Sequence, residues 1–77
     1  MNSKEKILES FASHLKAIRK AQGISIRELS SRSNLEYSQV QRIEKGKVNI
    51  AFTTLIALAD GLNIKPSELI KDLHIAI

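Results

Sequence analysis

The stretch 31-SRSNLEYSQVQRIEKG-46 decides the fold, because its few apolar residues have spacings that one continuous helix does not explain. Leu35 and Val40 are five residues apart, whereas apolar residues on one helical face recur every three or four residues. Asn34 is of the non-glycine type that best tolerates the left-handed backbone conformation. If a helix ends there and the next starts after Glu36, Leu35 and Val40 form a hydrophobic staple. The sequence therefore predicts two short helices joined by a tight turn.

The second of these helices, predicted over residues 37–45, has two chemically different sides. On a helical wheel, Val40 and Ile43 lie on one side, and the opposite side is an arc of about 140° without a carboxylate. This outer arc carries hydrogen-bonding groups and two cations, on Tyr37, Ser38, Gln41, Arg42 and Lys45. Such groups can contact base edges and phosphates, and the second helix of a helix-turn-helix fits the major groove of DNA. An ordinary solvated polar face is the alternative interpretation.

Apolar periodicity and cap residues predict four further helices. The first ends before Gly23, and Ser25 with Glu28 forms a capping box at the start of the next. Pro66 occupies the first position of the last helix, and the helix before it is apolar around much of its circumference. We therefore expect that helix to be the central buried one. The predicted ranges are 5–22, 25–33, 52–62 and 66–73, which with residues 37–45 give one all-α domain over residues 1–77.

Composition excludes several classes of protein. The chain has 77 residues, 43% hydrophobic and 4% aromatic, so it predicts one small domain with an aliphatic core. It contains no cysteine, which excludes a disulfide and fits a reducing compartment. No apolar run reaches the roughly 18 residues of a membrane span, and residues 1–10 lack the apolar region of a signal peptide. These features predict a cytoplasmic protein that has no membrane partner.

Catalytic and metal-binding patterns are also missing from the sequence. The two histidines, His14 and His74, are sixty residues apart, which resembles no common zinc-ligand spacing. The three glycines lie at or near predicted helix ends, so they form no phosphate-binding loop. No serine stands beside a plausible base, and no carboxylate pair forms a recognisable site. We therefore expect neither an enzyme nor a cofactor, metal or small-molecule ligand.

Positive charge is concentrated around the opening stretch. The chain carries +4 in total, but residues 16–47 hold eight basic and three acidic side chains, a net charge of +5. A polyanion is the natural partner of such a segment, although a solvated basic surface is the simpler alternative.

Two segments, 25-SIRELSSRSNLEYSQVQRIEKGKVN-49 and 54-TLIALADGLNI-64, together resemble the Cro/C1-type (XRE-like) helix-turn-helix family of regulators. The resemblance runs without gaps from about residue 11 to residue 70, and IEKG at 43–46 is its strongest element. It implies a compact five-helix bundle of the lambda-repressor-like DNA-binding type, with the helix-turn-helix formed by the second and third helices. Members bind DNA, commonly as symmetric dimers. The resemblance thus implies a DNA-binding transcriptional regulator that inserts its third helix into the major groove of double-stranded DNA.

The same resemblance implies roles for individual residues. Arg19 and Glu44 match positions that often pair, and we expect a partly buried ion pair there. Two departures blur the contact pattern: Ile26 replaces a frequent glutamine, and Glu36 replaces a frequent serine. Base contacts are expected from Tyr37, Ser38, Gln41 and Arg42. Phosphate contacts are expected from Ser25, Arg27, Lys45, Lys47 and Asn49.

The C-terminal region is unusually apolar for a chain end. Its surplus apolar residues suggest a homodimer contact that would pair two reading helices on a palindromic operator. The alternative is that the tail folds back on its own subunit. The candidate interface residues are Leu69, Ile70, Leu73, Ile75 and Ile77. A repressor or autoregulator is the leading functional hypothesis, and an antitoxin or another protein-interaction module with the same fold is the alternative.

Overall fold

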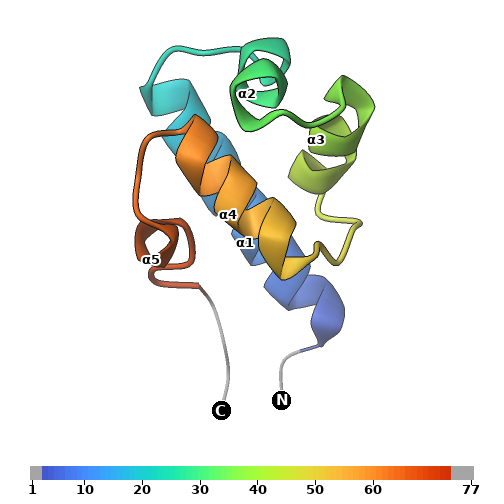
Figure 1. Cartoon of the computed structure of the whole chain (residues 1–77). Helices are drawn as coiled ribbons and strands as arrows, with labels where there is room; N and C mark the ends of the chain where they lie inside the picture. The colour runs from blue at the N-terminus through green and yellow to red at the C-terminus, as the bar shows by residue number, and fades with distance from the viewer. Residues whose placement is uncertain (1–2, 74–77) are drawn as a thin grey trace.

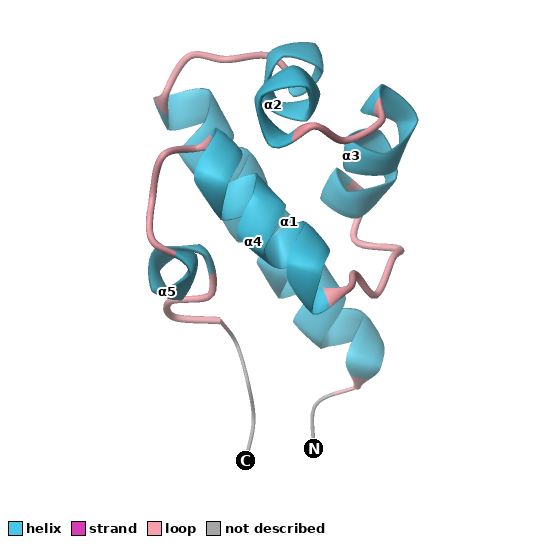
Figure 2. Ribbon diagram, in the orientation of Figure 1, coloured by secondary structure: helices cyan, strands magenta, loops and turns pink. Residues whose placement is uncertain are grey.

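The computed structural model describes residues 3–73 and contains five helices and no strand within that range (Figures 1 and 2). The all-α class expected from the sequence is therefore confirmed. The first four helices begin and end within one residue of their predicted limits. The helices are α1 (Lys4–Ala21), α2 (Ile26–Ser33), α3 (Tyr37–Glu44), α4 (Phe52–Gly61) and α5 (Pro66–Leu69).

Helix α5 is shorter than the sequence predicted, since it ends at Leu69 instead of continuing to residue 73. The backbone of Ile70 already departs from helical geometry, with φ of −110° and ψ of 8°. Asp72 then adopts a φ of 58°, in the left-handed region that an α-helix cannot contain. The apolar spacing of Leu69, Ile70 and Leu73 fits a longer helix, but it does not reveal this turn.

Polar side chains and left-handed residues set the limits of the short helices. The hydroxyl of Ser25 accepts a hydrogen bond from the backbone N–H of Glu28 at 3.0 Å and so caps α2. Asn34 ends the same helix with φ of 57° and ψ of 42°, the left-handed conformation predicted for it. Glu36 precedes α3 as its N-cap residue but makes no capping hydrogen bond through its side chain. The turn between α2 and α3 is therefore fixed mainly by Asn34 and by packing.

The core is aliphatic apart from one phenylalanine, as the composition predicted. Leu35 and Ile26 pack against this core from partly buried positions, and Val40 is fully buried. Leu35 before α3 and Val40 within it therefore both pack on the core, as the predicted hydrophobic staple requires. The buried apolar residues are Phe11, Ala12, Leu15, Ile24, Leu29, Val40, Ile43, Leu58, Ala59, Leu62 and Leu69.

Helix α2 packs mainly on α4, and a glycine allows them to approach closely. A Cβ atom at Gly61 would lie 2.1 Å from the hydroxyl oxygen of Ser33 and 3.1 Å from its backbone nitrogen. Gly61 is the last residue of α4. The structure gives it a packing role, because a side chain there would displace Ser33.

Two hydrogen bonds join segments that are distant in sequence. His14 of α1 donates from Nε2 to the backbone carbonyl of Glu68 in α5, at 2.8 Å. Gln22, after α1, donates from Nε2 to the carbonyl of Leu62, after α4, at 2.7 Å. These contacts hold the bundle together on the side away from α3, which lies at the edge of the molecule (Figure 1). None of the helices in residues 3–73 is both long and apolar enough to cross a membrane.

Candidate nucleic-acid interface

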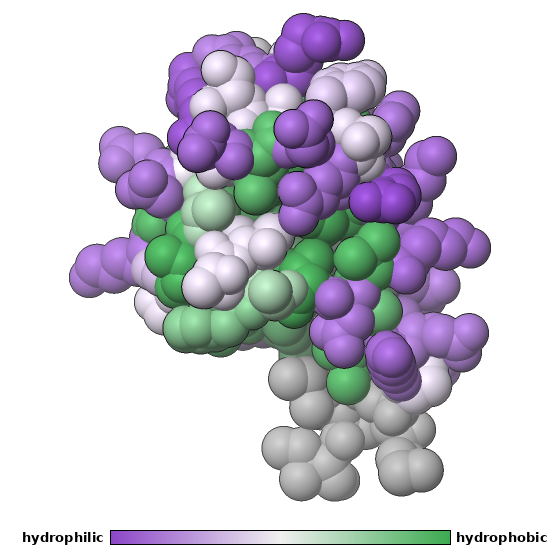
Figure 3. Space-filling view, turned by 45° about the vertical axis from the view of Figure 1, so that its right-hand side comes forward, coloured by the Kyte–Doolittle hydropathy of each residue, from purple (hydrophilic) through white to green (hydrophobic). Residues whose placement is uncertain are grey.

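Helix α3 buries one narrow side and leaves the other uncovered. Val40, Ile43 and Glu44 are buried, whereas Tyr37, Ser38, Arg42 and Lys45 are exposed and Gln41 is half-buried. The uncovered side contains the same five residues that the helical wheel placed on its outer arc. It carries two cations and no carboxylate, because the acidic residue at the end of α3 points inward. Figure 3, with the right-hand side of Figure 1 turned forward, shows mainly hydrophilic residues over the upper part of the molecule.

The inward-pointing Glu44 is neutralised by Arg19. Arg19 donates from Nε to Glu44 Oε2 at 2.6 Å and from Nη2 to Oε1 at 3.0 Å, a bidentate pair with side chains 9% and 2% exposed. Its third nitrogen, Nη1, donates to the carbonyl of Ile24 at 2.8 Å. The hydrogen bond with Glu44 raises the pKa of Arg19 above its ordinary value, although burial acts in the opposite direction. Arg19 therefore joins α1, the loop before α2, and α3.

This network keeps the face beside α3 basic. A hollow of about 260 Å³ between α1, α2 and α3 is lined by Lys16, Lys20 and Lys45 together with the Arg19–Glu44 pair. Because the only carboxylate in its lining is already paired, the three lysines carry the net charge there. Ile26, where the family resemblance led us to expect glutamine, lines the same hollow and packs against the core. An apolar packing role therefore replaces hydrogen bonding at this position.

Arg27 and Tyr37 lie together where α2 and α3 begin. The guanidinium carbon of Arg27 is 4.5 Å from the centroid of the Tyr37 ring, a cation–π contact between exposed side chains. Both residues line a second hollow together with Ser25, whose hydroxyl caps α2. Arg27 was expected to contact phosphate and Tyr37 to contact bases, each independently. Their contact with each other was not predicted from the sequence. They are ten residues apart across a turn, so only the turn geometry reveals that they meet.

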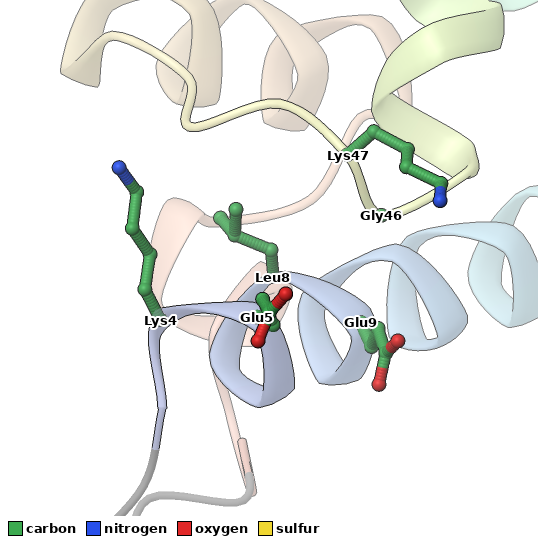
Figure 4. Close-up of a pocket in the computed structure, with 6 residues that line it drawn as sticks. All are labelled: Lys4, Glu5, Leu8, Glu9, Gly46 and Lys47. Atoms are coloured by element: carbon green, nitrogen blue, oxygen red, sulfur yellow. The ribbon is translucent and has the colours of Figure 1, made fainter.

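Lys47 follows α3 in the loop that leads to α4. Gly46 permits the turn with φ of 73°, and a Cβ there would lie 3.1 Å from the Cα of Glu9. The loop consequently packs against the start of α1, beside a hollow that Lys4, Glu5 and Glu9 also line (Figure 4). Within residues 3–73, Lys47 forms no ion pair with either glutamate. Its charge is therefore available to a ligand, and Asn49 beyond it is exposed.

The candidate dimer residues fall into three groups. Leu69 is fully buried in the core of its own chain, so its assignment to a dimer contact is wrong. Ile70 and Leu73 line an apolar groove of about 290 Å³. Ile75 and Ile77, like His74, lie outside the described residues. The groove is also lined by Ile7, Leu8, Phe11, Ile50, Ala51, Phe52 and Leu55.

Among the described residues, no group of three or more His, Cys, Asp or Glu side chains could hold a metal ion.

Comparison with known proteins gives consistent results. A family model described as HTH_3, helix-turn-helix, matches residues 15–69. The HTH-type transcriptional regulator y4dL of Sinorhizobium fredii is 37% identical over 57 residues, which are 74% of this chain but only 29% of that protein. The restriction-modification controller protein C.AhdI from Aeromonas hydrophila is 35% identical, with a TM-score of 0.78 over 80% of this chain and 94% of that one.

A second solved structure supports the fold alone. An HTH_3 family transcriptional regulator from Vibrio cholerae superposes with a TM-score of 0.82 at 24% identity. The match covers 87% of this chain and 38% of that regulator.

Proposed function

Because this chain belongs to the HTH_3 family of helix-turn-helix proteins, we propose that it is a DNA-binding transcriptional regulator that inserts α3 into the major groove. The observation that carries this proposal is the uncovered, carboxylate-free outer side of α3. It matches what a groove-reading helix requires: polar groups toward the bases and cations toward the phosphates. The proposed role requires access to DNA and therefore agrees with the cytoplasmic location expected from the sequence.

Base recognition falls to the first turns of α3. Arg42 can donate two hydrogen bonds to one guanine, and Gln41 can pair in a similar way with adenine. Tyr37 and Ser38 lie at the start of the helix, which faces the bases in this type of docking. Ser25, Arg27, Lys45, Lys47 and Asn49 are proposed to contact the sugar-phosphate backbone, and all five are exposed. These contacts would fix the register but would not depend on sequence.

Replacing Arg42 with alanine tests base recognition. We expect the free energy of binding to a selected operator to weaken by about 1–3 kcal/mol, while binding to random duplex changes much less. The operator would first be obtained by selecting bound oligonucleotides with the purified protein, and affinities measured by fluorescence anisotropy. Equal losses on both duplexes would show that Arg42 contacts only phosphate. Failure of the unaltered protein to retain any duplex at low salt would instead favour a protein-interaction module.

Lys47→Ala provides the matched comparison for backbone contacts. It should weaken binding to the operator and to random duplex alike, because a phosphate contact carries no sequence information. The negative slope of log K against log salt concentration should become less steep by about 0.9, which is the contribution of one neutralised phosphate. An unchanged slope would remove Lys47 from the backbone contacts.

The proposed regulator is a homodimer formed through the apolar groove. Phe52 and Ile70 line the groove and are 73% and 46% exposed, unusually high fractions for large apolar side chains. Hydrophobic surface gathers in the middle and lower part of the face shown in Figure 3. A second copy would cover this surface by two-fold symmetry and present two α3 helices to adjacent turns of a palindromic operator. Similarity to the restriction-modification controller protein C.AhdI supports a regulatory role for this chain.

Phe52→Ser tests this dimer. It should raise the dimer dissociation constant at least tenfold, an effect on the order of 1.4 kcal/mol from lost apolar burial. Sedimentation equilibrium measures the constant directly. Ile56→Ser is the matched control, because Ile56 is an exposed residue of the same helix that does not line the groove. Equal effects of the two substitutions, or a monomeric parent protein at high concentration, would contradict an interface at the groove.

A further inference from the structure

The contact between Arg27 and Tyr37 bridges the two helices of the helix-turn-helix. Arg27 lies in the first turn of α2 and Tyr37 is the first residue of α3, and the guanidinium carbon is 4.5 Å from the ring centroid. Both side chains are exposed, so the contact is not a by-product of core packing. It fixes the position of a long, otherwise mobile cation at the edge of the proposed DNA-binding face.

Among the described residues, Arg27 forms no ion pair with a carboxylate. The neighbouring residue Glu28 forms an ion pair with Arg32, in which Arg32 Nη2 lies 2.6 Å from Glu28 Oε2. Glu44 is paired with Arg19. The hollow beside the stack has a volume of about 430 Å³. Its lining includes both Arg27 and Arg19 but no acidic residue. An anion that entered this hollow would meet the uncompensated guanidinium.

The chemistry of stacking explains why a ring suits this purpose better than a carboxylate. A carboxylate would also fix the guanidinium, but it would neutralise the charge and occupy its N–H donors. An aromatic face contacts the flat surface of the guanidinium, whose five donors lie in its plane and stay available. A side chain held in place before binding loses less freedom when the ligand arrives.

We propose that Tyr37 is a positioning residue, whose ring holds Arg27 in place to bind a phosphate of the DNA backbone. The two residues then act as one unit, and part of the contribution of Tyr37 to DNA affinity passes through Arg27. This inference rests on the proposed function. It deepens that proposal by coupling two residues that were expected to act separately.

Binding to random-sequence duplex at low salt tests this coupling, because a phosphate contact does not depend on sequence. Arg27→Ala should weaken binding several-fold and lower the salt slope by about 0.9. Tyr37→Leu should also weaken binding and lower the slope, although it removes no charge. Tyr37→Phe should keep the salt slope of the parent, because the ring face that holds Arg27 remains. The double variant should bind no more weakly than Arg27→Ala alone, since the two changes remove one unit.

Two controls separate positioning from a general structural effect. Lys47→Ala removes an exposed cation that belongs to neither ion pair and does not touch the stack, and it should leave the Tyr37→Leu effect unchanged. In the free protein, nuclear magnetic resonance should show ring-current shifts of the Arg27 side-chain protons that disappear in Tyr37→Leu and persist in Tyr37→Phe. Circular dichroism should give all the variants the same helical content.

The outcomes that would overturn the inference are distinct from those that would overturn the proposed function. Additive losses in the double variant, or an unchanged salt slope in Tyr37→Leu, would show that Tyr37 does not position Arg27. An unchanged affinity in Arg27→Ala would overturn it as well. In each of these cases the parent protein still binds DNA. If the parent bound no duplex at all, the proposed function would fall and this inference would fall with it.

Discussion

Replacing Arg19 with alanine is expected to lower the free energy of unfolding by about 3–5 kcal/mol, because it leaves the buried carboxylate of Glu44 without its partner. The substitution also removes the donor to the Ile24 carbonyl, so the loop before α2 loses a contact at the same time. A domain of this size has roughly 3–5 kcal/mol of stability to spare from its core. Circular dichroism should therefore find a substantial unfolded fraction of Arg19→Ala at room temperature even without urea.

The chain contains its own control for this experiment. Arg32 and Glu28 form a second ion pair with the same 2.6 Å distance, but their side chains are 45% and 47% exposed. Exposed pairs one helical turn apart contribute only about 0.3–0.5 kcal/mol, and salt screens them. Arg32→Ala should therefore change stability very little. Comparable losses in both variants would contradict the special role assigned to the buried pair.

A double substitution separates the charge from the packing at this position. Replacing a buried ion pair with apolar residues of similar volume is often neutral or stabilising. Arg19→Met with Glu44→Leu should accordingly recover most of the stability lost in Arg19→Ala. It should not recover all of it, because methionine cannot donate to the Ile24 carbonyl. A double variant as unstable as the single one would show that the hydrogen bond to the loop is the larger contribution.

Local sequence patterns predicted the helices because their causes are local. Apolar periodicity and end residues such as Ser25 and Asn34 act within a few positions, and the first four helices were placed within one residue. The same wheel also identified the uncovered side of α3. A staple of Leu35 and Val40 explained the one irregular spacing in the stretch, and both residues reach the core.

The features that the sequence did not predict depend on how the helices pack against one another. An apolar residue near the chain end can cover its own core or a partner, and only the packed structure assigns Leu69 to the core. Helix α5 ends at Leu69 and Asp72 adopts the left-handed conformation, whereas the apolar spacing alone predicted a helix to residue 73. The stack of Arg27 on Tyr37 requires the angle between α2 and α3. These are the same relationships that determine how the proposed DNA-binding face is assembled.

The close approach of α2 to α4 leads to the second large effect, which is expected from Gly61→Ala. The added Cβ would lie 2.1 Å from the Ser33 hydroxyl oxygen, 3.2 Å from its Cβ and 3.1 Å from its backbone nitrogen. The hydroxyl must therefore turn away, and α2 must shift slightly away from α4. Overpacking of this kind costs about 1–3 kcal/mol, and a helix-propensity gain of at most about 1 kcal/mol opposes it. We expect a net loss of roughly 1–2 kcal/mol in the free energy of unfolding, measured by urea denaturation.

Substitutions of Ser33 test whether this steric contact causes the loss of stability. Ser33→Gly removes both side-chain atoms that the new Cβ would meet, so Gly61→Ala should cost much less in that background. Ser33→Ala alone should stabilise the protein slightly, because its buried hydroxyl has no hydrogen-bond partner in the described structure. Since α2 rests on α4 and α3 rests on α2, a forced separation would also displace the proposed reading helix. Gly61→Ala should then bind duplex DNA more weakly even where it remains folded, and an equal loss of stability with and without Ser33→Gly would refute the contact.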